Sequence, residues 1–575
     1  MIHSSFCRIF LSALYLLILA ATLHGENTSP PWEAPAFSAA PKDIAAAAAA
    51  IKAQKFANVT VLTEERHVVF DSEERTTSTV RIVYRIETKE ALGNWDTAKA
   101  TWSPWRQKRP QIRARVIAPD GTVAILDPKV LTESPQHDQR PEIYEDQRSY
   151  SGPLPAVGIG SIVEKETVWE DTAPMNNYGI MRRSYVGYSD PLLHEVVEIL
   201  APASVPMQYK LRKAPDFKVT RSENSGIVTL RFELGATDAL ENQERDLPSD
   251  VENWPSIDYS TGRSWNAVAQ GYYKDIESAI RPGDVGSLLE GTAGLKRPDL
   301  LRRLVTNLHQ KVRYTGLEFG SSALIPHPSG DTLKSGYGDC KDKAIVLVSA
   351  LQAAGIPAQL ALLETRGDTD VSPELAGIGI FDHAIVYIPG GPGTWIDATA
   401  EYFEPGDLPW SDQGRFALLV APESKQLVQT PINTPSENAQ NISRDFTLAE
   451  YGPAHVVEVF HSTGEESAVL RYRYGLAENK ETREGLERYV KNNLLADALT
   501  NEEHTSGSDL TKPFELKLEV AKGKRGLSDL TNAVVAIRTD GLLWGYPDFV
   551  LSDDGTDKPD NPGWKPRKNL SLIHI

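Results

Sequence analysis

The first half of the chain is dominated by short runs in which apolar and polar residues alternate. In the run TVRIVYRIE, Val80, Ile82, Tyr84 and Ile86 share one face, and charged residues take the other face. A period of two is typical of a half-buried β-strand. Similar runs follow at 112–118, 122–126, 160–169, 194–200 and 227–234, and a Pro-Asp-Gly turn separates the first two. We therefore predict an all-β, sandwich-like domain of antiparallel strands over residues 57–245.

The period becomes helical near residue 264. Trp265, Val268, Tyr272 and Ile276 recur at helical spacing, and a second helix is expected from Pro298 onward. Loops, a helix and strands then alternate between residues 315 and 420. This mixture predicts an α+β domain over residues 246–425.

Strand-like runs resume beyond residue 440, at 455–460, 468–474, 514–520 and 533–537, with a helix near 481–498. They predict a β-rich C-terminal domain over residues 426–575. The final LSLIHI continues no visible pattern, which leaves the true end of this domain open. A chain of 575 residues is long enough to form several separate cores.

A short apolar run lies near the N-terminus. Residues 9–21 (IFLSALYLLILAA) follow Arg8 and precede small or polar residues up to Gly25. The run is too short for a membrane-spanning helix and is typical of a signal peptide. We expect residues 1–25 to be a signal peptide and the mature chain to be periplasmic or secreted, in a Gram-negative bacterium. An uncleaved N-terminal membrane anchor is the alternative. Residues 26–56 are expected to form a flexible leader with a short helix that Asp43 caps.

The acidic balance of the chain limits its partners. The net charge is -18, and no run of five basic residues occurs. Like charge lowers both the affinity and the encounter rate for phosphate backbones. We therefore expect no nucleic-acid partner, and no stable membrane span once the signal peptide is removed. The oligomeric state stays open.

The chain has two cysteines, Cys7 and Cys340. Removal of the signal peptide would leave Cys340 alone, so no internal disulfide could form. A single cysteine in an exported protein is a candidate reactive thiol. A small buried apolar residue is the alternative interpretation.

The surroundings of Cys340 favour the reactive interpretation. The sequence GYGDCKDK places glycines just before the cysteine, and the apolar run AIVLVSALQAAG follows at once. This pattern predicts a tight loop that leads into a buried helix with Cys340 at its first turn. At a helix N-terminus the free N–H groups and the helix dipole stabilise a thiolate, and cysteines there can have pKa values of roughly 3.5–7.5.

A predicted hairpin supplies the partners that a thiolate nucleophile needs. The run FDHAIVYI reads as a strand, residues 389–393 as a turn, and TWIDA as the returning strand. If Ile388 pairs with Thr394, His383 lies opposite Thr399 and Asp397 becomes its diagonal neighbour on the same face. An imidazole with an orienting carboxylate is the usual activating pair for a cysteine nucleophile.

The phrases GDCKDKA, FDHAIVYIPG and TWIDAT resemble the Cys, His and Asp series of the transglutaminase-like superfamily, in that family's chain order. With RYTGLEFG upstream, the pattern is similar to bacterial exported proteins that join this core to an N-terminal β domain of unassigned function. The resemblance implies a papain-like α+β core, with Cys340 as nucleophile, His383 as general base and acid, and Asp397 as the orienting carboxylate.

The resulting expectation is an exported, thiol-dependent acyl-transfer enzyme that acts on a peptide, protein or amide substrate without a cofactor. Hydrolysis is preferred over transamidation, because no feature specifies a lysine acceptor pocket. The oxyanion donor is unassigned, with the Cys340 N–H as first candidate and Tyr337 as second. The alternative from another class is a non-catalytic scaffold that binds peptide or glycan. No metal is expected, because Asp339, Asp342, Asp382, His383 and Asp397 show no recognisable ligand spacing.

Overall fold

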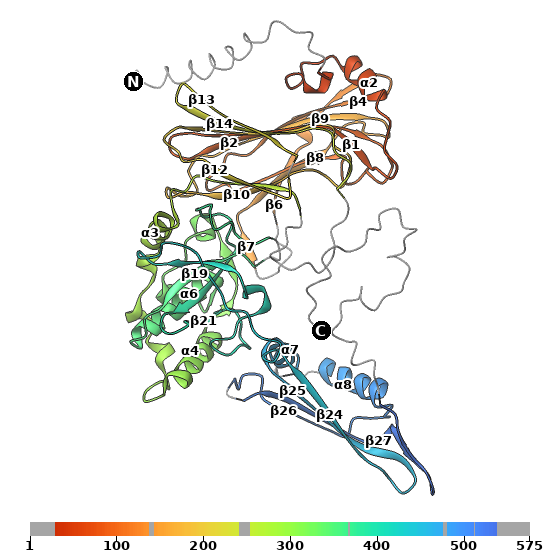
Figure 1. Cartoon of the computed structure of the whole chain (residues 1–575), viewed down its shortest axis with the longest axis vertical. Helices are drawn as coiled ribbons and strands as arrows, with labels where there is room; N and C mark the ends of the chain where they lie inside the picture. The colour runs from red at the N-terminus through yellow and green to blue at the C-terminus, as the bar shows by residue number, and fades with distance from the viewer. Residues whose placement is uncertain are drawn as a thin grey trace.

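The computed structural model describes residues 29–136, 143–214, 216–240, 254–365, 369–474, 480–510 and 512–537. The predicted signal peptide at 1–25 and the final LSLIHI lie outside these residues. Within the described parts of the chain, no helix is both long enough and apolar enough to cross a membrane. Figure 1 shows a β domain, a smaller α+β domain beside it, and a C-terminal domain of long strands.

The β domain is a sandwich whose main layer has eight strands, in the order β13-β14-β11-β1-β2-β9-β4-β5. These strands are β1 (Val59–Phe70), β2 (Thr76–Ile86), β4 (Gln111–Ile117), β5 (Val123–Ile125), β9 (Ile162–Glu170), β11 (Glu195–Pro202), β13 (Lys218–Asn224) and β14 (Ile227–Leu234). All neighbours pair antiparallel except β1 and β11, which are parallel, so the prediction of a wholly antiparallel sheet is wrong at that pair.

Two three-stranded sheets form the second layer of the sandwich (Figure 1). One has the order β10-β15-β12, and the other β3-β8-β6. Their strands are β3 (Thr97–Trp102), β6 (Thr132–Pro135), β8 (Arg148–Pro153), β10 (Met181–Tyr185), β12 (Gln208–Arg212) and β15 (Ser256–Ser260). Because β15 lies beyond residue 245, the β domain extends past the predicted boundary, at least to residue 260.

The predicted leader packs onto the β domain instead of standing apart from it. Its helix α2 (Pro41–Ala49) forms as expected, but Ala40 is the N-cap and Asp43 lies in the first turn. Trp32 is only 4% exposed and Ile44 is fully buried. Both contact the outer face of the main sheet, where Leu62, Val83, Ile117 and Ile162 lie.

Buried charges connect the leader to that outer face. Glu164 is fully buried on β9, and its two carboxylate oxygens accept from Arg81 at 2.7 Å and from Arg115 at 2.6 Å. The backbone N–H of Phe37 in the leader also donates to Glu164, at 2.8 Å. The charged face of β2 is therefore covered by protein. The half-buried strand expected from the TVRIVYRI alternation is buried on both faces, because its arginines have a buried partner.

The central domain is built around α6 (Cys340–Ala353), in which every residue from Lys341 to Leu351 is buried. A five-stranded sheet packs against it in the order β21-β20-β19-β22-β23. The strands are β19 (Gln359–Leu363), β20 (His383–Ile388), β21 (Thr394–Ile396), β22 (Phe416–Val420) and β23 (Val428–Gln429). The two predicted helices are α3 (Trp265–Ile276), capped by Ser264, and α4 (Arg297–Lys311). A short α5 (Ser329–Ser335) leads toward α6.

Backbone hydrogen bonds join the β domain to the central domain. Ile180 and Ile378 form a parallel bridge, in which the N–H of Met181 donates to Ile378 at 2.8 Å. A Cβ atom on Gly377 would lie 2.4 Å from the backbone of Ile180, so only glycine permits this approach. A second link pairs β7 (Ile143–Glu145) with β17 (Gly316–Glu318). Strand β10 is thereby held beside the segment that leads into His383.

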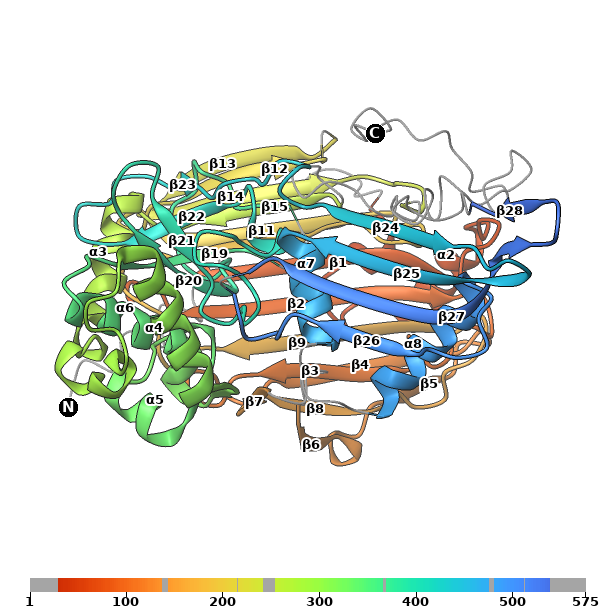
Figure 2. The same ribbon diagram turned by 90° about the horizontal axis from the view of Figure 1, so that it is seen from below.

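The C-terminal domain has a sheet in the order β24-β25-β27-β26, with β28 also on β27. Its strands are β24 (Gln440–Thr447), β25 (Gly452–Ser462), β26 (Asn501–His504), β27 (Phe514–Ser528) and β28 (Ala533–Val535). The helix α8 (Lys480–Asn493) was predicted. The run at 468–474 was predicted as a strand and is part of α7 (Gly464–Tyr474), because Arg471 turns inward and donates to loop carbonyls near residue 507. Figure 2 shows α7 and α8 lying across this sheet.

The buried carboxylate of Glu164 offers a direct test of the sandwich and its leader. We expect Glu164→Gln to destabilise the β domain by about 3–5 kcal/mol, because it removes the buried charge that two buried guanidinium groups share, and only Arg81 keeps another carboxylate, Glu65. Glu166→Gln is the matched control on the same strand face, since its partner Arg113 is 57% exposed, and it should cost about 0–1 kcal/mol. Native-state hydrogen exchange in peptides from 29–51 and 76–117 would measure both variants. Equal protection in the two variants would contradict the structural role of Glu164.

Candidate active site

Cys340 is the first residue of α6, as predicted. The helix begins with a capping box in which Asp339 accepts from the backbone N–H of Asp342, and Asp342 accepts from that of Asp339. Gly336 ends α5 with φ +75, and a Cβ atom on Gly338 would lie 2.6 Å from Asp342. The loop therefore needs glycine at both positions to bring the cysteine to the helix start. Cys340 itself is only partly buried.

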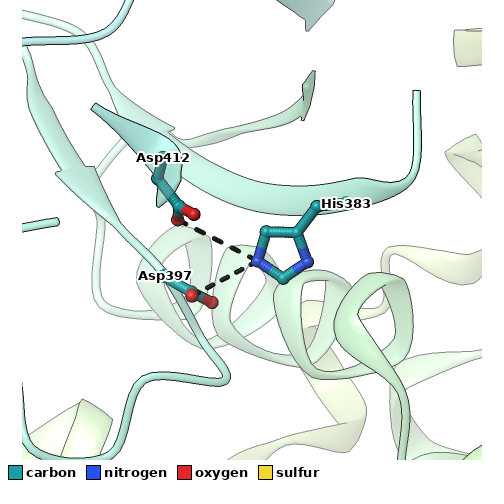
Figure 3. Close-up of side chains that lie close together, drawn as sticks. All are labelled: His383, Asp397 and Asp412. Atoms are coloured by element: carbon teal, nitrogen blue, oxygen red, sulfur yellow. Dashed lines mark ion pairs between the residues drawn. The ribbon is translucent and has the colours of Figure 1, made fainter. Parts of the chain in front are cut away.

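His383 and Asp397 meet across the predicted hairpin. Ile388 pairs with Thr394, which is the register inferred from the sequence. Nε2 of His383 lies 3.2 Å from Oδ2 of Asp397. Asp397 also accepts from the backbone N–H and the hydroxyl of Thr399, at 2.7 and 2.8 Å. Figure 3 shows the other ring nitrogen of His383 pointing away from the carboxylates.

The pair holds a proton on the imidazole. Burial by itself would lower the pKa of His383, but the Asp397 carboxylate and the Cys340 side chain outweigh it and raise that pKa well above its ordinary value. Burial raises the pKa of Asp397, but the histidine and the Thr399 hydrogen bonds outweigh this effect, and the net shift is downward. His383 thus lies between a carboxylate and a cysteine, and both favour its protonated form.

Cys340 and His383 open onto one cavity of about 650 Å³. Its wall comes partly from the central domain and partly from β10 and neighbouring residues of the β domain. Tyr272, predicted only as part of an apolar helix stripe, also reaches this cavity, and its hydroxyl donates to the Leu324 carbonyl at 2.8 Å. Its ring is buried, so periodicity alone could not distinguish it from a core residue.

The second oxyanion candidate, Tyr337, is not among the residues that line this cavity. Its ring lies under Arg313 instead, 5.7 Å from the guanidinium carbon. The Cys340 N–H remains the first candidate. It belongs to the first helical turn, where backbone N–H groups have no partner within the helix.

A second carboxylate, Asp412, was missed by the sequence analysis. It ends a short 3-10 helix (Trp410–Asp412), is 1% exposed, and places Oδ2 at 4.0 Å from Nε2 of His383. That oxygen has no hydrogen-bond partner in the described chain. Burial and the nearby Asp397 raise the pKa of Asp412 to about 7. No spacing in the sequence ties Asp412 to the hairpin, so only the fold reveals it.

The acidic residues weighed as metal ligands are distributed differently. Asp339 and Asp342 are occupied at the start of α6, and Asp382 accepts from the backbone of Thr365 at 2.8 Å. Among the described residues, His383, Asp397 and Asp412 place one donor atom each within 4.8 Å of one another, a spacing that could also accommodate an ion. Their contacts have the distances of hydrogen bonds and ion pairs, and Asp397 is already bound by Thr399.

Comparisons with known proteins identify the two larger domains. Residues 291–400 match the family model of the transglutaminase-like superfamily, and residues 72–241 match that of a domain of unknown function, DUF3857. A comparison with curated proteins finds no match. The chain therefore combines a transglutaminase-like superfamily core with an N-terminal DUF3857 domain, which confirms the predicted family and fold class.

A solved structure shares this fold over most of the chain. A "putative protease" from Parabacteroides distasonis aligns with a TM-score of 0.54 at 12% identity, over 81% of this chain and 94% of its own. An M1 zinc metallopeptidase from Deinococcus radiodurans has a TM-score of 0.18 at 12% identity, over 35% of this chain and 42% of its own. Leukotriene A4 hydrolase from Saccharomyces cerevisiae has a TM-score of 0.20 at 12% identity, over 36% of this chain and 29% of its own. The two low scores support no conclusion about this chain.

The raised pKa of Asp412 predicts how stability depends on pH. In the unfolded chain this carboxyl ionises near its ordinary value of 3.8, and in the folded chain near 7. The unfolded state therefore loses its proton first, and folding stability falls as pH rises between these values. We expect Asp412→Asn to remove this fall. The free energy of unfolding of the variant, relative to that of wild type, should therefore increase by roughly 2–4 kcal/mol between pH 4 and pH 7.

Native-state hydrogen exchange of peptides from the central domain would measure this difference in the intact chain. A constant offset between the two proteins across the pH range would contradict the buried, late-ionising Asp412.

Proposed function

We propose that this chain is a thiol-dependent acyl-transfer enzyme that hydrolyses peptide or amide bonds, with Cys340 as nucleophile, His383 as general base and acid, and Asp397 as the orienting carboxylate. The observation that carries the proposal is the 3.2 Å contact of His383 with Asp397 beside the cavity onto which Cys340 opens. Membership of the core in the transglutaminase-like superfamily supports an enzymatic role.

The proposed reaction begins with attack of the Cys340 thiolate on the amide carbonyl carbon, which forms a C–S bond and an oxyanion. The His383 imidazolium then gives its proton to the leaving nitrogen as the C–N bond breaks, leaving a thioester. Water adds to the thioester while His383 takes its proton, the C–S bond breaks, and a carboxylic acid leaves. Asp397 holds the ring in one orientation throughout and stabilises its positive form.

Two features support hydrolysis over simple binding. A binding module has no need for an imidazole with a raised pKa beside a partly accessible cysteine. Asp397, the carboxylate partner of this imidazole, is almost completely buried, and burial of a charged pair costs free energy of folding.

We also propose export of the chain, from the apolar run at residues 9–21. The intact mass of periplasmic protein, expected to begin near Glu26, would test that.

Turnover of a fluorescently labelled peptide library would test the activity. Cys340→Ala should abolish cleavage, and His383→Ala should lower kcat by about 10³-fold or more, because the general base is lost. Asp397→Asn should be milder, since the carboxylate orients rather than reacts. Circular dichroism would confirm that each variant is folded. Cleavage that persists in Cys340→Ala would reject the thiol mechanism.

The reactivity of Cys340 can be measured without knowing the substrate. Iodoacetamide should modify it readily at pH 6, where an ordinary thiol of pKa about 8.5 is ionised by well under 1%. His383→Ala should move the reaction to higher pH, because it removes the cation that pairs with the thiolate. Mass spectrometry from pH 5 to 9 would follow the rate, with urea-unfolded protein as the control. If the folded protein reacts with the same pH dependence as the unfolded control, Cys340 is a packing residue and not an activated thiol.

A further inference from the structure

The cavity at Cys340 receives three arginines from the β domain, Arg106, Arg182 and Arg183. Two of them are already paired. Arg106 donates to Asp171 at 2.9 Å, and Arg183 donates to Asp258 at 2.9 Å. Asp171 is itself saturated, because Gln107 and Thr76 also donate to it. These two arginines therefore support the wall of the cavity.

Arg182 differs from its neighbours. It is half-buried on β10 and lines the same cavity, but no hydrogen bond or ion pair joins its guanidinium group to any other described residue. The acidic residues on this wall, Glu318, Glu364 and Asp382, have other interactions and form no ion pair with it. Arg106 and Arg182 line the same cavity. The pKa of Arg106 is lowered, mainly by burial and in part by the Arg182 charge, although Asp171 opposes this shift. Among the described residues, the guanidinium group of Arg182 is therefore left without a charge partner.

The position of Arg182 relative to the catalytic pair is fixed by backbone contacts. The backbone N–H of its neighbour Met181 donates to the carbonyl of Ile378, five residues before His383. The close approach of Gly377 to the Ile180 backbone leaves no space for β10 to shift along this segment. The strand also pairs with β15 along its whole length. A group bound to Arg182 would thus be held at a defined place in the cavity that contains Cys340 and His383.

We propose that Arg182, with Arg106 beside it, forms a subsite for a carboxylate of the substrate. A guanidinium fork binds a carboxylate through two parallel N–H···O bonds, which gives both strength and orientation. A carboxylate bound there would pair with the Arg182 guanidinium, to which no described side chain is paired. The chain as a whole is acidic, but charges farther away than about 8–10 Å are largely screened at physiological salt. The side chains that line the cavity, Arg182 among them, therefore matter more for substrate choice than the net charge of the chain.

Two sources of a carboxylate are compatible with this subsite: an acidic side chain, or the free C-terminus of a short peptide. Four matched peptides separate them: a peptide amide with Glu, the same amide with Gln, the Gln peptide with a free C-terminus, and an all-Ala amide. The inference rests on the proposed hydrolase activity. Protection of Cys340 from iodoacetamide by each peptide is therefore measured alongside kcat/KM, because protection requires no turnover.

We expect at least one carboxylate peptide to have a kcat/KM about tenfold or more above that of its neutral counterpart, mainly through a lower KM. Its half-protecting concentration should be about tenfold or more below that of the neutral peptide. Arg182→Gln should bring that ratio close to one, and Arg182→Lys should retain part of it, since lysine keeps the charge but lacks the fork. Arg113→Gln, a change at an exposed arginine outside the cavity, should leave the ratio unchanged.

The outcomes separate the two proposals. Cys340-dependent cleavage without a carboxylate preference, or a preference that survives in Arg182→Gln, would overturn the subsite alone. Absence of cleavage with all peptides would count against the hydrolase. Arg182-dependent protection by a carboxylate peptide would still support the subsite in that case, and equal protection by all four peptides would overturn it.

Discussion

The close backbone contact between the β domain and the segment before His383 is the constraint on which the site depends. Gly377 allows the chain to pass within contact distance of Ile180, and the bridge to Ile378 fixes the register. This contact turns two separately folded layers into the walls of one cavity. A larger residue at 377 would push β10 away from the histidine. The β domain thus forms part of the wall of the cavity at Cys340 and is not merely attached to the core.

Local patterns in the sequence predicted correctly where Cys340, His383 and Asp397 lie in the fold. The glycines and the apolar run around Cys340 correctly indicated a helix start, and the turn at 389–393 fixed the pairing of Ile388 with Thr394. From these two elements the contact between His383 and Asp397 followed. Asp412 could not be predicted in this way, because it reaches the histidine through a loop whose path depends on the whole domain.

The errors in the fold prediction also have physical reasons. The alternation in β2 correctly indicated a strand, but charged residues such as Arg81 suggested a solvent-exposed face. A buried partner, Glu164, comes from a strand 83 residues away, and no local pattern reveals it. Similarly, alternating residues at 468–474 suggested a strand, whereas a buried Arg471 with carbonyl partners stabilises a helix. In both cases an arginine that appears polar in sequence satisfies its donors inside the protein.

The helix that carries Cys340 is enclosed on every side from Lys341 to Leu351. Close-packed positions tolerate few substitutions, because changes in volume cost stability. The opposite wall of the cavity is a strand of the neighbouring domain, where Arg182 makes no contact that the fold requires. Single changes of side chain on β10 would therefore alter the lining of the cavity without disturbing the packed helix that carries Cys340. The two domains divide the cavity into a wall whose packing resists substitution and a wall whose side chains can change at little cost in stability.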